Sequence, residues 1–535
     1  MPEKPQVAPP VALQQQLQLI EALQQQGQPM ALIETHISWI LLTGDFAYKI
    51  KKALDLDFLD FSTLDQREFY CKEEIRLNRR LAPDIYLDVV PIGGSYGVPQ
   101  LGHLPALEYA VRMRRFAVSD QMDVLLAEGR LHAHHIDRLA AILARFHASL
   151  TPTDPGSAFG RADAILAVSR QNFEQLDVLL GDSGDDTELQ RLQTLRLATE
   201  AEFAACRGLF EQRRNDGFVR ECHGDLHLGN IVLIDDQPVP FDCLEFDPGL
   251  RWIDVINELA FPVMDLIHRQ HSRFAFRLLN AYLEISGDYA GVALLRFYLA
   301  GRAMVRAKVS AIRIAQGGAT QSDTAQADAA QTSYLDLADA LLRTRRPALI
   351  ISHGLPGSGK STLAQAMLER RQAIRLRSDV ERKRLFGLAA LDNSRTTHQD
   401  IYSAAATRQT YDRLLQTARE LLAAGWTVIV DAAFLRQAER TLFGQLARQM
   451  AAPFVIASTQ ADAATLRSRI QRRSTLGNDA SEADLAVLAQ LTSAQEALST
   501  QELAHTAIFA SRAGSSGFED LTESWERLDR LLAAT

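Results

Sequence analysis

A glycine-rich segment between an apolar run and helical sequence constrains the fold of this 535-residue chain most strongly. The segment GLPGSGKST (354–362) fits the pattern GxxxxGK[ST]. It follows the apolar run 347–352, which predicts a buried strand, and helical sequence begins at Ser361. Strand, glycine loop and helix in this order predict a phosphate-binding loop. The alternative is a glycine-rich turn that precedes Lys-Ser by chance, which the flanking strand and helix disfavour.

The residue types of this loop suit the binding of a nucleotide and magnesium. Glycines let backbone N–H groups curl around phosphates, and the positive end of the following helix adds to the attraction. We expect Lys360 to reach the β- and γ-phosphates and the Ser361 hydroxyl to ligate Mg²⁺. The predicted nucleotide-binding residues are Gly354, Gly357, Ser358, Gly359, Lys360, Ser361 and Thr362. Two later apolar runs, 426–432 and 453–459, alternate with helical sequence and predict a parallel α/β sheet.

Two aspartates near predicted strand ends are candidates for catalysis and metal binding. Asp379 follows the predicted strand 373–377, where a carboxylate can accept the proton of an attacking hydroxyl, although it could equally cap the next helix. Arg382 lies one helical turn further on and can hold an anionic acceptor. Asp431 lies at the end of the apolar run 426–432, where it can hold magnesium or cap the strand.

A basic segment at 465–473 predicts a helix that carries Arg469 and Arg473 on one face. A mobile arginine lid over the transferred phosphate would account for this pattern. A solvated basic helix face is the alternative.

Four motifs together resemble the P-loop kinases related to polynucleotide 5′-kinase, zeta-toxin kinases and chloramphenicol phosphotransferase. They are GLPGSGKST, RSDxxR, VIVDAxF and RIQRR, and the resemblance spans about 345–500. It implies that Asp379 is the general base and that Arg382 contacts the acceptor. It also implies that a lid arginine, Arg469 or Arg473, stabilises the transferred charge. The nucleotide it implies is ATP, with GTP as the alternative, together with Mg²⁺.

A second signature lies upstream, in the segment HGDLHLGN (223–230). Its spacing HxDxxxxN is that of a catalytic loop in which the aspartate accepts the acceptor's proton and the asparagine binds magnesium. Asp225 and Asn230 fit these roles. Asp242 follows a short apolar stretch, where a second metal-ligating carboxylate is expected.

Folds with such a catalytic loop also need a strand lysine paired with a glutamate on the next helix. Lys49, on the second strand of a predicted hairpin, and Glu74, on the helix predicted next, are the candidates for this cofactor-binding pair. Lys51 lies on the same strand face as Lys49, and Glu73 adjoins Glu74, so each assignment stays open between neighbours. A solvated charged edge is the alternative for both.

The stretches HGDLHLGN and FDCLEFDPGLRWIDV, with the strand AYKIKK, resemble the aminoglycoside phosphotransferase and choline-kinase branch of the protein-kinase fold. The similarity covers roughly 30–310, without a GxGxxG loop upstream. It implies that Asp225 is the catalytic base, that Asn230 and Asp242 hold magnesium, and that Asp254 braces the loop from a helix. The acidic set that would suit a cationic acceptor, with helix capping and solvation as the alternative, is Glu245, Asp247, Asp254 and Glu258.

These patterns predict a fold that combines α/β and α+β classes. An N-terminal protein-kinase-like two-lobed domain precedes a C-terminal P-loop NTPase domain with a parallel sheet. The polar, aromatic-free stretch 317–331 is the best linker candidate. The expected divisions are an N-terminal extension at 1–30 with a frayed start over 1–10, a kinase-like domain at 31–312, a linker at 313–345 and a P-loop domain at 346–535.

Composition narrows the function classes. The net charge of −9 argues against non-specific coating of nucleic acid. No long apolar run or signal-like N-terminus is visible, so we expect a cytoplasmic protein without membrane association. The four cysteines lack zinc-ligand spacing, which favours reduced thiols.

The two signatures together predict a bifunctional ATP-dependent kinase that phosphorylates hydroxyl groups of small metabolites. One alternative makes one domain a nucleotide-binding regulatory module for the other. Another makes the C-terminal domain a nucleic-acid 5′-hydroxyl kinase, which the acidic chain disfavours. The sequence carries no signal for an oligomeric state.

Overall fold

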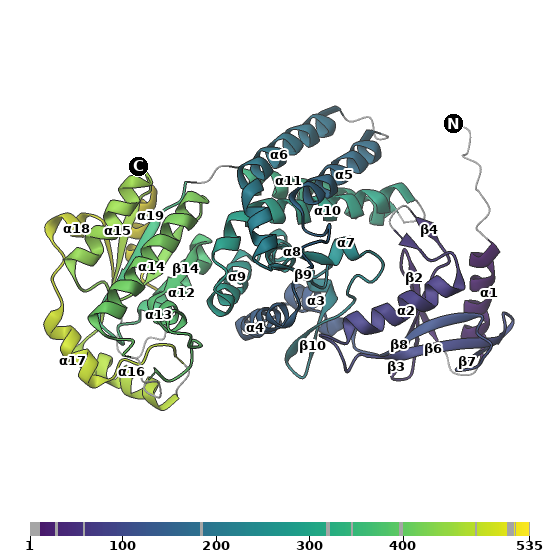
Figure 1. The fold of residues 1–535 in the computed structure, drawn as a ribbon, viewed down its shortest axis with the longest axis horizontal. Helices are drawn as coiled ribbons and strands as arrows, with labels where there is room; N and C mark the ends of the chain where they lie inside the picture. Colours follow the sequence, from purple (N-terminus) through teal and green to yellow (C-terminus); the bar gives the residue numbers. More distant parts are fainter. Residues whose placement is uncertain are drawn as a thin grey trace. The chain divides into compact units, whose positions relative to one another are not determined.

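The computed structural model describes residues 11–26, 30–56, 59–181, 186–316, 321–343, 346–394, 400–476, 479–510, 518 and 520–533 (Figure 1). The frayed start predicted at 1–10 lies outside these residues. The chain forms two compact units. The first unit comprises 1–138, 149–165 and 210–262, and the second comprises 139–148, 166–209 and 263–535. The domain boundaries predicted above stay a prediction.

The first unit contains a six-stranded antiparallel sheet in the order β1-β2-β3-β8-β6-β7. The predicted hairpin forms its second and third strands, because Gly44 supplies the positive φ that the tight turn requires. The strands are β1 (Ala31–Glu34), β2 (Ser38–Thr43), β3 (Phe46–Lys51), β6 (Tyr86–Ser95), β7 (Val98–Leu101) and β8 (Glu108–Arg114).

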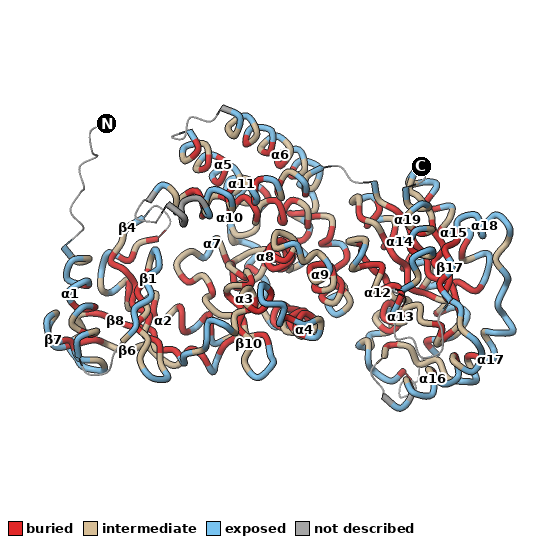
Figure 2. Tube along the Cα trace, turned by 180° about the vertical axis from the view of Figure 1, so that it is seen from behind, coloured by how far each residue is buried: buried red, intermediate tan, exposed pale blue. Residues whose placement is uncertain are grey.

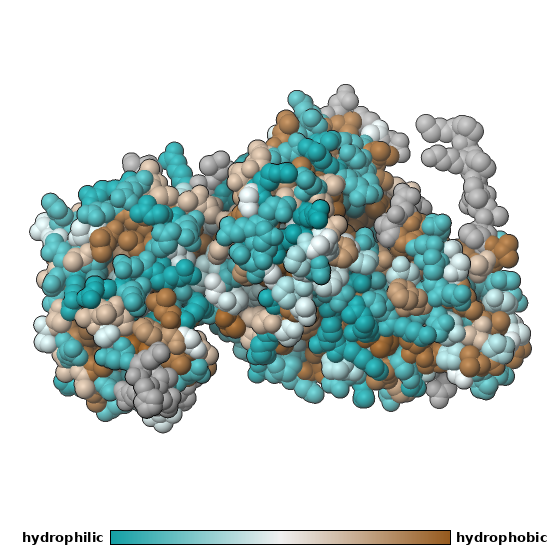
Figure 3. Space-filling model, in the orientation of Figure 1, coloured by the Kyte–Doolittle hydropathy of each residue, from teal (hydrophilic) through white to brown (hydrophobic). Residues whose placement is uncertain are grey.

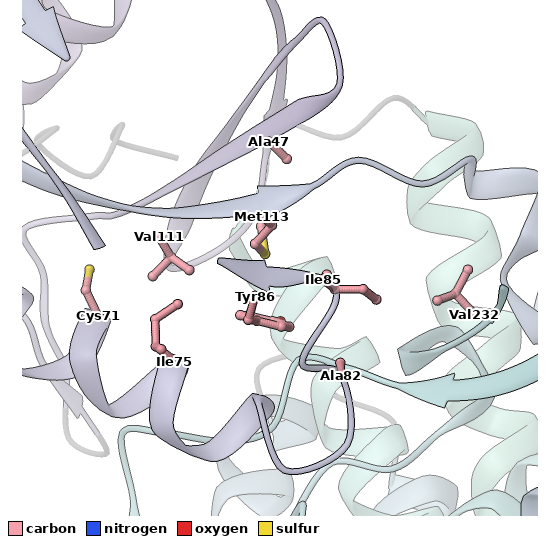
Figure 4. Packing of buried hydrophobic residues seen from close by; sticks show 9 residues of the cluster. All are labelled: Ala47, Cys71, Ile75, Ala82, Ile85, Tyr86, Val111, Met113 and Val232. Atoms are coloured by element: carbon pink, nitrogen blue, oxygen red, sulfur yellow. The ribbon is translucent and has the colours of Figure 1, made fainter. Parts of the chain in front are cut away.

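Two apolar clusters fill the two faces of this sheet, since alternate residues of a strand point to opposite sides. Helix α2 (Leu64–Asn78) packs Cys71 and Ile75 against Val111 on one face (Figure 4). Helix α1 (Val11–Gln25) buries Leu19 in the cluster on the other face, which includes Ile50. Helix α1, within the predicted N-terminal extension, therefore forms part of the core of this unit.

Short elements after residue 210 carry the second signature. Strand β9 (Val219–Glu221) pairs with β12 (Trp252–Asp254), and β10 (Ile231–Ile234) pairs with β11 (Gln237–Pro240), both antiparallel. The remaining elements of this unit are β4 (Asp55–Leu56), β5 (Leu59–Asp60), η1 (Val118–Asp120), α3 (Met122–Ala127), η2 (Leu228–Asn230) and α7 (Pro248–Arg251). Four helices run through both units: α4 (Ala133–Ser149), α5 (Ala162–Gly181), α6 (Asp186–Asn215) and α8 (Val255–His268).

The second unit contains a five-stranded parallel sheet in the order β14-β15-β13-β16-β17, as predicted. Its strands are β13 (Leu349–His353), β14 (Ile374–Arg377), β15 (Val428–Asp431), β16 (Phe454–Gln460) and β17 (Thr506–Ala510). Helices α12 (Lys360–Arg371), α14 (Ala404–Ala423), α15 (Gln437–Gln449) and α19 (Thr522–Ala533) pack against it. Strands β13, β14 and β15 are almost wholly buried (Figure 2). The unit also contains α13 (Ser378–Leu385), α16 (Ala463–Leu476), α17 (Leu485–Ala494) and α18 (Thr500–Ala504).

Helices also precede the parallel sheet within this unit: α9 (Ser272–Ser286), η3 (Ala290–Leu294), α10 (Leu295–Gln316) and α11 (Gln321–Leu342). The segment predicted as a linker is largely helical, because α11 packs along α10 and buries Tyr334, Leu335 and Ala338. These residues recur at helical spacing just after 317–331, so the part of α11 that packs on α10 continues a helix that includes the polar stretch from Gln321. Only its start, at 317–320, lies outside the described residues.

No helix within the described ranges is long and apolar enough to cross a membrane. Figure 3 shows hydrophilic residues spread over the visible face.

Candidate active sites

A buried cluster of charges joins β3 to α2 in the first unit. Lys49 Nζ donates to Glu74 Oε1 at 2.9 Å and to Asp242 Oδ1 at 2.6 Å. Lys51 Nζ donates to the other Glu74 oxygen at 2.7 Å and to Glu245. The predicted Lys49–Glu74 pair is therefore present, and Glu74 bridges both candidate lysines.

Burial distinguishes the two lysines. The Lys51 side chain is 0% exposed and the Lys49 side chain is 9% exposed. Lys49 also contacts Asp242, whose side chain is 43% exposed. Burial favours the neutral amines, but the surrounding carboxylates outweigh it and raise the pKa of both lysines above the ordinary value. Lys49 thus lies at the opening of the cluster and Lys51 in its interior. Glu73 pairs with Arg76 at the surface, which leaves Glu74 as the partner of the lysines.

The segment 223–230 brings the two predicted catalytic-loop residues together. Asn230 Nδ2 donates to the backbone oxygen of Asp225 at 2.9 Å and to its Oδ2 at 3.1 Å. The Asp225 side chain is 36% exposed, so an acceptor hydroxyl can reach it. The ring nitrogen Nε2 of His223 lies 2.8 Å from the carbonyl oxygen of Phe241, which ties this loop to the residue before Asp242.

Asp242 is held against Lys49 by its backbone. It has a φ of 63°, in the left-handed region, and its N–H donates to the hydroxyl of Tyr86 at 3.1 Å. The next N–H, of Cys243, donates to Asn78 Oδ1 at 2.8 Å. Burial raises the pKa of Asp242, but Lys49 outweighs it and holds the pKa below the ordinary value. The first unit therefore places an ionised carboxylate beside the strand lysine.

Glu258, in the first turn of α8, holds the start of the segment 223–230 by hydrogen bonds to its backbone. Its Oε1 accepts the N–H of His223 at 2.5 Å, and its Oε2 accepts the N–H of Gly224 at 3.0 Å. The resemblance gave this role to Asp254, and that assignment is wrong. Asp254 ends β12 and forms two bonds with Arg213, at 2.7 and 2.8 Å. A carboxylate in the first turn of a helix was the available signal for Glu258.

The acidic set that could suit a cationic acceptor has other partners. Glu245 pairs with Lys51, and Asp247 caps α7. Asp254 and Glu258 are engaged as described above. Ion pairing, helix capping and hydrogen bonds from backbone N–H groups therefore engage all four carboxylates.

Replacing Glu258 with Ala is expected to lower the free energy of unfolding by about 2–4 kcal/mol, because two buried N–H groups lose their acceptor. Denaturant unfolding of the full chain measures this loss. Glu128→Ala, which breaks an exposed ion pair with Arg130, is the control and should cost at most about 0.5 kcal/mol. Equal losses in the two variants would contradict the bracing role.

The phosphate-binding loop of the second unit needs its glycines. Gly354, Gly357 and Gly359 have φ values of 148°, 81° and 98°. A Cβ at Gly354 would lie 2.7 Å from the carbonyl oxygen of Thr459, and one at Gly357 would lie 2.9 Å from that of Leu466. Side chains at these positions would clash with backbone, so the loop is shaped by close approach as well as by φ.

Lys360 begins α12 and folds back over the loop, where its Nζ donates to the carbonyl oxygen of Leu355 at 2.9 Å. Burial lowers the pKa of Lys360 below the ordinary value, although Asp431 and Asp379 oppose the shift. The predicted lysine and both predicted aspartates therefore share one electrostatic environment. Ser358 is held by a 2.7 Å hydroxyl contact with Thr459.

Asp431 ends β15 and is 5% exposed. Within the described part of the chain, its Oδ2 has no hydrogen-bond partner. The nearest cation is Arg377, whose Nε lies 3.9 Å from this oxygen. A buried carboxylate oxygen without a donor is costly unless a cation binds it, and carboxylate and hydroxyl oxygens are the ligands that Mg²⁺ prefers. Asp431 with Ser361 thus fits the predicted metal site.

Asp379 lies inside the first turn of α13, and the N-cap of that helix is Arg377, whose side chain makes no capping hydrogen bond. The alternative in which Asp379 caps the helix is therefore wrong. Asp379 lines the same cavity as Lys360 and Asp431. A general base for an acceptor bound in this cavity is expected at such a position.

The three predicted arginines also line this cavity but are held differently. Arg382 is buried and donates to the backbone carbonyl of Ile401 at 2.9 Å. Arg469 donates to the carbonyl of Gly357 in the phosphate-binding loop at 3.3 Å, and Arg473 donates to another backbone carbonyl at 2.8 Å. Arg469 is thus the arginine in direct contact with the glycine loop, whereas Arg382 joins α13 to the segment before α14.

The cavity has a volume of about 1610 Å³. Ligand sites for one small molecule have volumes of about 300–1,000 Å³, so this cavity has room for a nucleotide and an acceptor together. Its basic lining residues are Lys360, Arg377, Arg382, Arg408, Arg436, Arg469, Arg472 and Arg473.

The folds and the two clusters define a phosphotransferase that joins an aminoglycoside-phosphotransferase-like domain to a P-loop kinase-like domain. Residues 74–295 match the family described as "Phosphotransferase enzyme family", and residues 349–498 match the family described as "AAA domain". The chain belongs to the same family as two uncharacterized mycobacterial proteins, Rv2004c of Mycobacterium tuberculosis H37Rv and Mb2027c of Mycobacterium bovis. Each is 32% identical over 463 residues, which cover 85% of this chain and 89% of the relative.

Solved structures resemble parts of the chain. A choline/ethanolamine kinase family protein from Mesorhizobium loti is 11% identical and covers 61% of this chain and 99% of its own, with a TM-score of 0.34. A gluconokinase from Sinorhizobium meliloti 1021 is 20% identical and covers 35% of this chain and 95% of its own, with a TM-score of 0.24.

Proposed function

We propose that this protein is a bifunctional ATP-dependent kinase, in which each catalytic cluster transfers a γ-phosphoryl group to the hydroxyl of a small metabolite. The observation that carries the proposal is the presence of two separate sets of catalytic groups in one chain. Asp225 lies with Asn230 in the first unit, and Asp379 shares a cavity with Lys360 and Asp431 in the second.

In the first unit, Asp225 accepts the proton of the attacking hydroxyl, because it is ionisable, partly exposed and oriented by Asn230. Lys49, fixed by Glu74, neutralises charge on the nucleotide phosphates. Asn230 and Asp242 would hold Mg²⁺, which supplies charge neutralisation at the transferred group when it is bound.

In the second unit, the backbone N–H groups of the glycine loop and Lys360 bind the phosphates. Asp379 accepts the proton of the acceptor, and Arg469, in contact with Gly357, stabilises charge on the transferred group. Ser361 and Asp431 would hold Mg²⁺ here. ATP is the preferred nucleotide, with GTP as the alternative.

Small hydroxylated metabolites are the preferred acceptors at both sites. The net charge of −9 disfavours a surface that tracks a nucleic-acid backbone. We place the protein in the cytoplasm, where ATP and magnesium are abundant.

Transfer of label from γ-labelled ATP with magnesium tests the proposal. The acceptors are a pool of small metabolites and a pool of 5′-hydroxyl oligonucleotides, and wild type is compared with Asp225→Ala and Asp379→Ala. We expect labelled metabolites of two kinds, each lost in only one variant. Labelled oligonucleotides lost with Asp379→Ala would instead identify a nucleic-acid kinase. Absence of label from both pools with nucleotide still bound would contradict the proposal and favour a regulatory module.

A further inference from the structure

Helix α9 completes the outer edge of the parallel sheet within the second unit. It packs against α12 and against β14, the edge strand (Figure 1). The side-chain amide of Asn280 binds this edge in two directions. Its Nδ2 donates to the carbonyl of Ala373 at 2.9 Å, and its Oδ1 accepts the N–H of Arg375 at 2.6 Å. Asn280 therefore occupies the place of a neighbouring strand and fixes α9 to the sheet.

One turn further along α9, Glu284 binds two arginines of β14. Its Oε1 accepts from Arg375 Nε at 2.9 Å, and its Oε2 accepts from Arg377 Nη1 at 3.3 Å. Burial raises the pKa of Glu284, but the two arginines outweigh it and hold the pKa below the ordinary value. Glu284 is therefore a buried anion that holds both guanidinium groups.

Arg377 connects Glu284 to the phosphate site. Its Nη2 lies 3.1 Å from Asp479 Oδ1, and its Nε lies 3.9 Å from Asp431 Oδ2, which has no hydrogen-bond partner among the described residues. The guanidinium thus faces three carboxylates and makes its hydrogen bonds with two of them. Because it stands just outside hydrogen-bond distance of Asp431, a small shift would form that bond.

We propose that Glu284 is a positioning residue of the P-loop site. It holds Arg377 back from Asp431 and so leaves that carboxylate available to the cation of a bound nucleotide. This role rests on the proposed function of the loop. Glu284 lies within residues 74–295, the segment that matches the phosphotransferase family. A side chain of that segment therefore sets the charge balance in the P-loop cavity.

Loss of the Glu284 charge should move Arg377 toward the remaining carboxylates. Asp479 already accepts a hydrogen bond from Arg377, so Asp431 is the carboxylate that should gain a contact with this guanidinium. A guanidinium on Asp431 competes with Mg²⁺ for the same oxygen. Nucleotide binding without magnesium does not use Asp431 and should be unaffected.

Titration of the full-length protein with a fluorescent ATP analogue, with and without Mg²⁺, tests this role. The part of the ATP-analogue binding that is lost in Lys360→Ala is assigned to the P-loop. The test variants are Glu284→Gln, which removes the charge, and Glu284→Asp, which keeps it. Glu369→Gln is the matched control, because it removes a 2.9 Å ion pair with Arg277 that also joins α9 to α12.

In wild type, Mg²⁺ should tighten the P-loop component. In Glu284→Gln this tightening should fall about fivefold or more, since a charge-assisted contact to Arg377 is lost, with magnesium-free affinity unchanged. Glu284→Asp should retain most of the tightening and Glu369→Gln all of it. Wild-type behaviour in Glu284→Gln, or equal losses in Glu284→Gln and Glu369→Gln, would overturn the positioning role alone. Absence of any Lys360-dependent binding in wild type would overturn the proposed P-loop function together with this role.

Discussion

Replacing Asp379 with Asn is expected to lower turnover at the P-loop site by about 100- to 10,000-fold, the range in which general-base catalysis contributes. The amide has the same size but cannot accept the acceptor's proton. Asp379 lines the cavity from inside the first turn of α13 and does not cap that helix, so its loss should leave the helix in place. Nucleotide affinity should change by less than about twofold, because the proposed function assigns the phosphates to the loop and Lys360.

Two measurements separate this effect from damage to the site. Label transfer to the acceptor gives kcat, and titration with a fluorescent ATP analogue gives affinity. Asp412→Asn is the control, because Asp412 lines the same cavity from α14, and its kcat should stay within about threefold of wild type. A kcat in Asp379→Asn close to that of the control, or a parallel loss of nucleotide affinity, would contradict the role of base.

Sequence motifs predicted those parts of the two sites whose residues lie close together in the chain. The glycine loop is specified by residues between one strand and one helix, and the structure places Lys360 and Ser361 at the start of that helix. Asn230 and Asp225 lie in one short segment and meet as expected. The same holds for the hairpin that carries Lys49.

Contacts between distant segments were not predictable in this way. Lys49 and Lys51 lie on one strand face, and only the packing around them shows that one is at the opening and the other inside. Glu258 and Glu284 act on His223 and Arg377, which are far away in the chain, so no spacing reveals these partners. The predicted linker became helix α11 because Ala and Gln favour helix and the apolar residues between them find a partner in α10.

Replacing Lys51 with Met is expected to lower the free energy of unfolding by about 3–5 kcal/mol, because the removal of one partner leaves buried charge uncompensated. Lys51 is the shared partner of Glu74 and Glu245, and all three side chains are nearly inaccessible. Burial already holds the pKa of Glu245 above its ordinary value even with Lys51 present. In the variant that pKa should rise further, and Glu245 should take up a proton on folding.

This proton uptake gives the loss a pH dependence. A carboxyl whose pKa is higher in the folded state than in the unfolded state stabilises the fold at low pH, and that contribution is lost as pH rises. Lys51→Met should therefore lose more stability relative to wild type at pH 8 than at pH 5, as urea unfolding at the two pH values would measure. The double variant Lys51→Met, Glu245→Met removes both charges and should recover part of the loss. A Lys51→Met loss below about 1 kcal/mol, typical of exposed pairs, would contradict the interior role of Lys51. Lys49→Met should cost less stability, because its partner Asp242 is partly exposed, and it removes the charge that the proposed function assigns to the nucleotide phosphates.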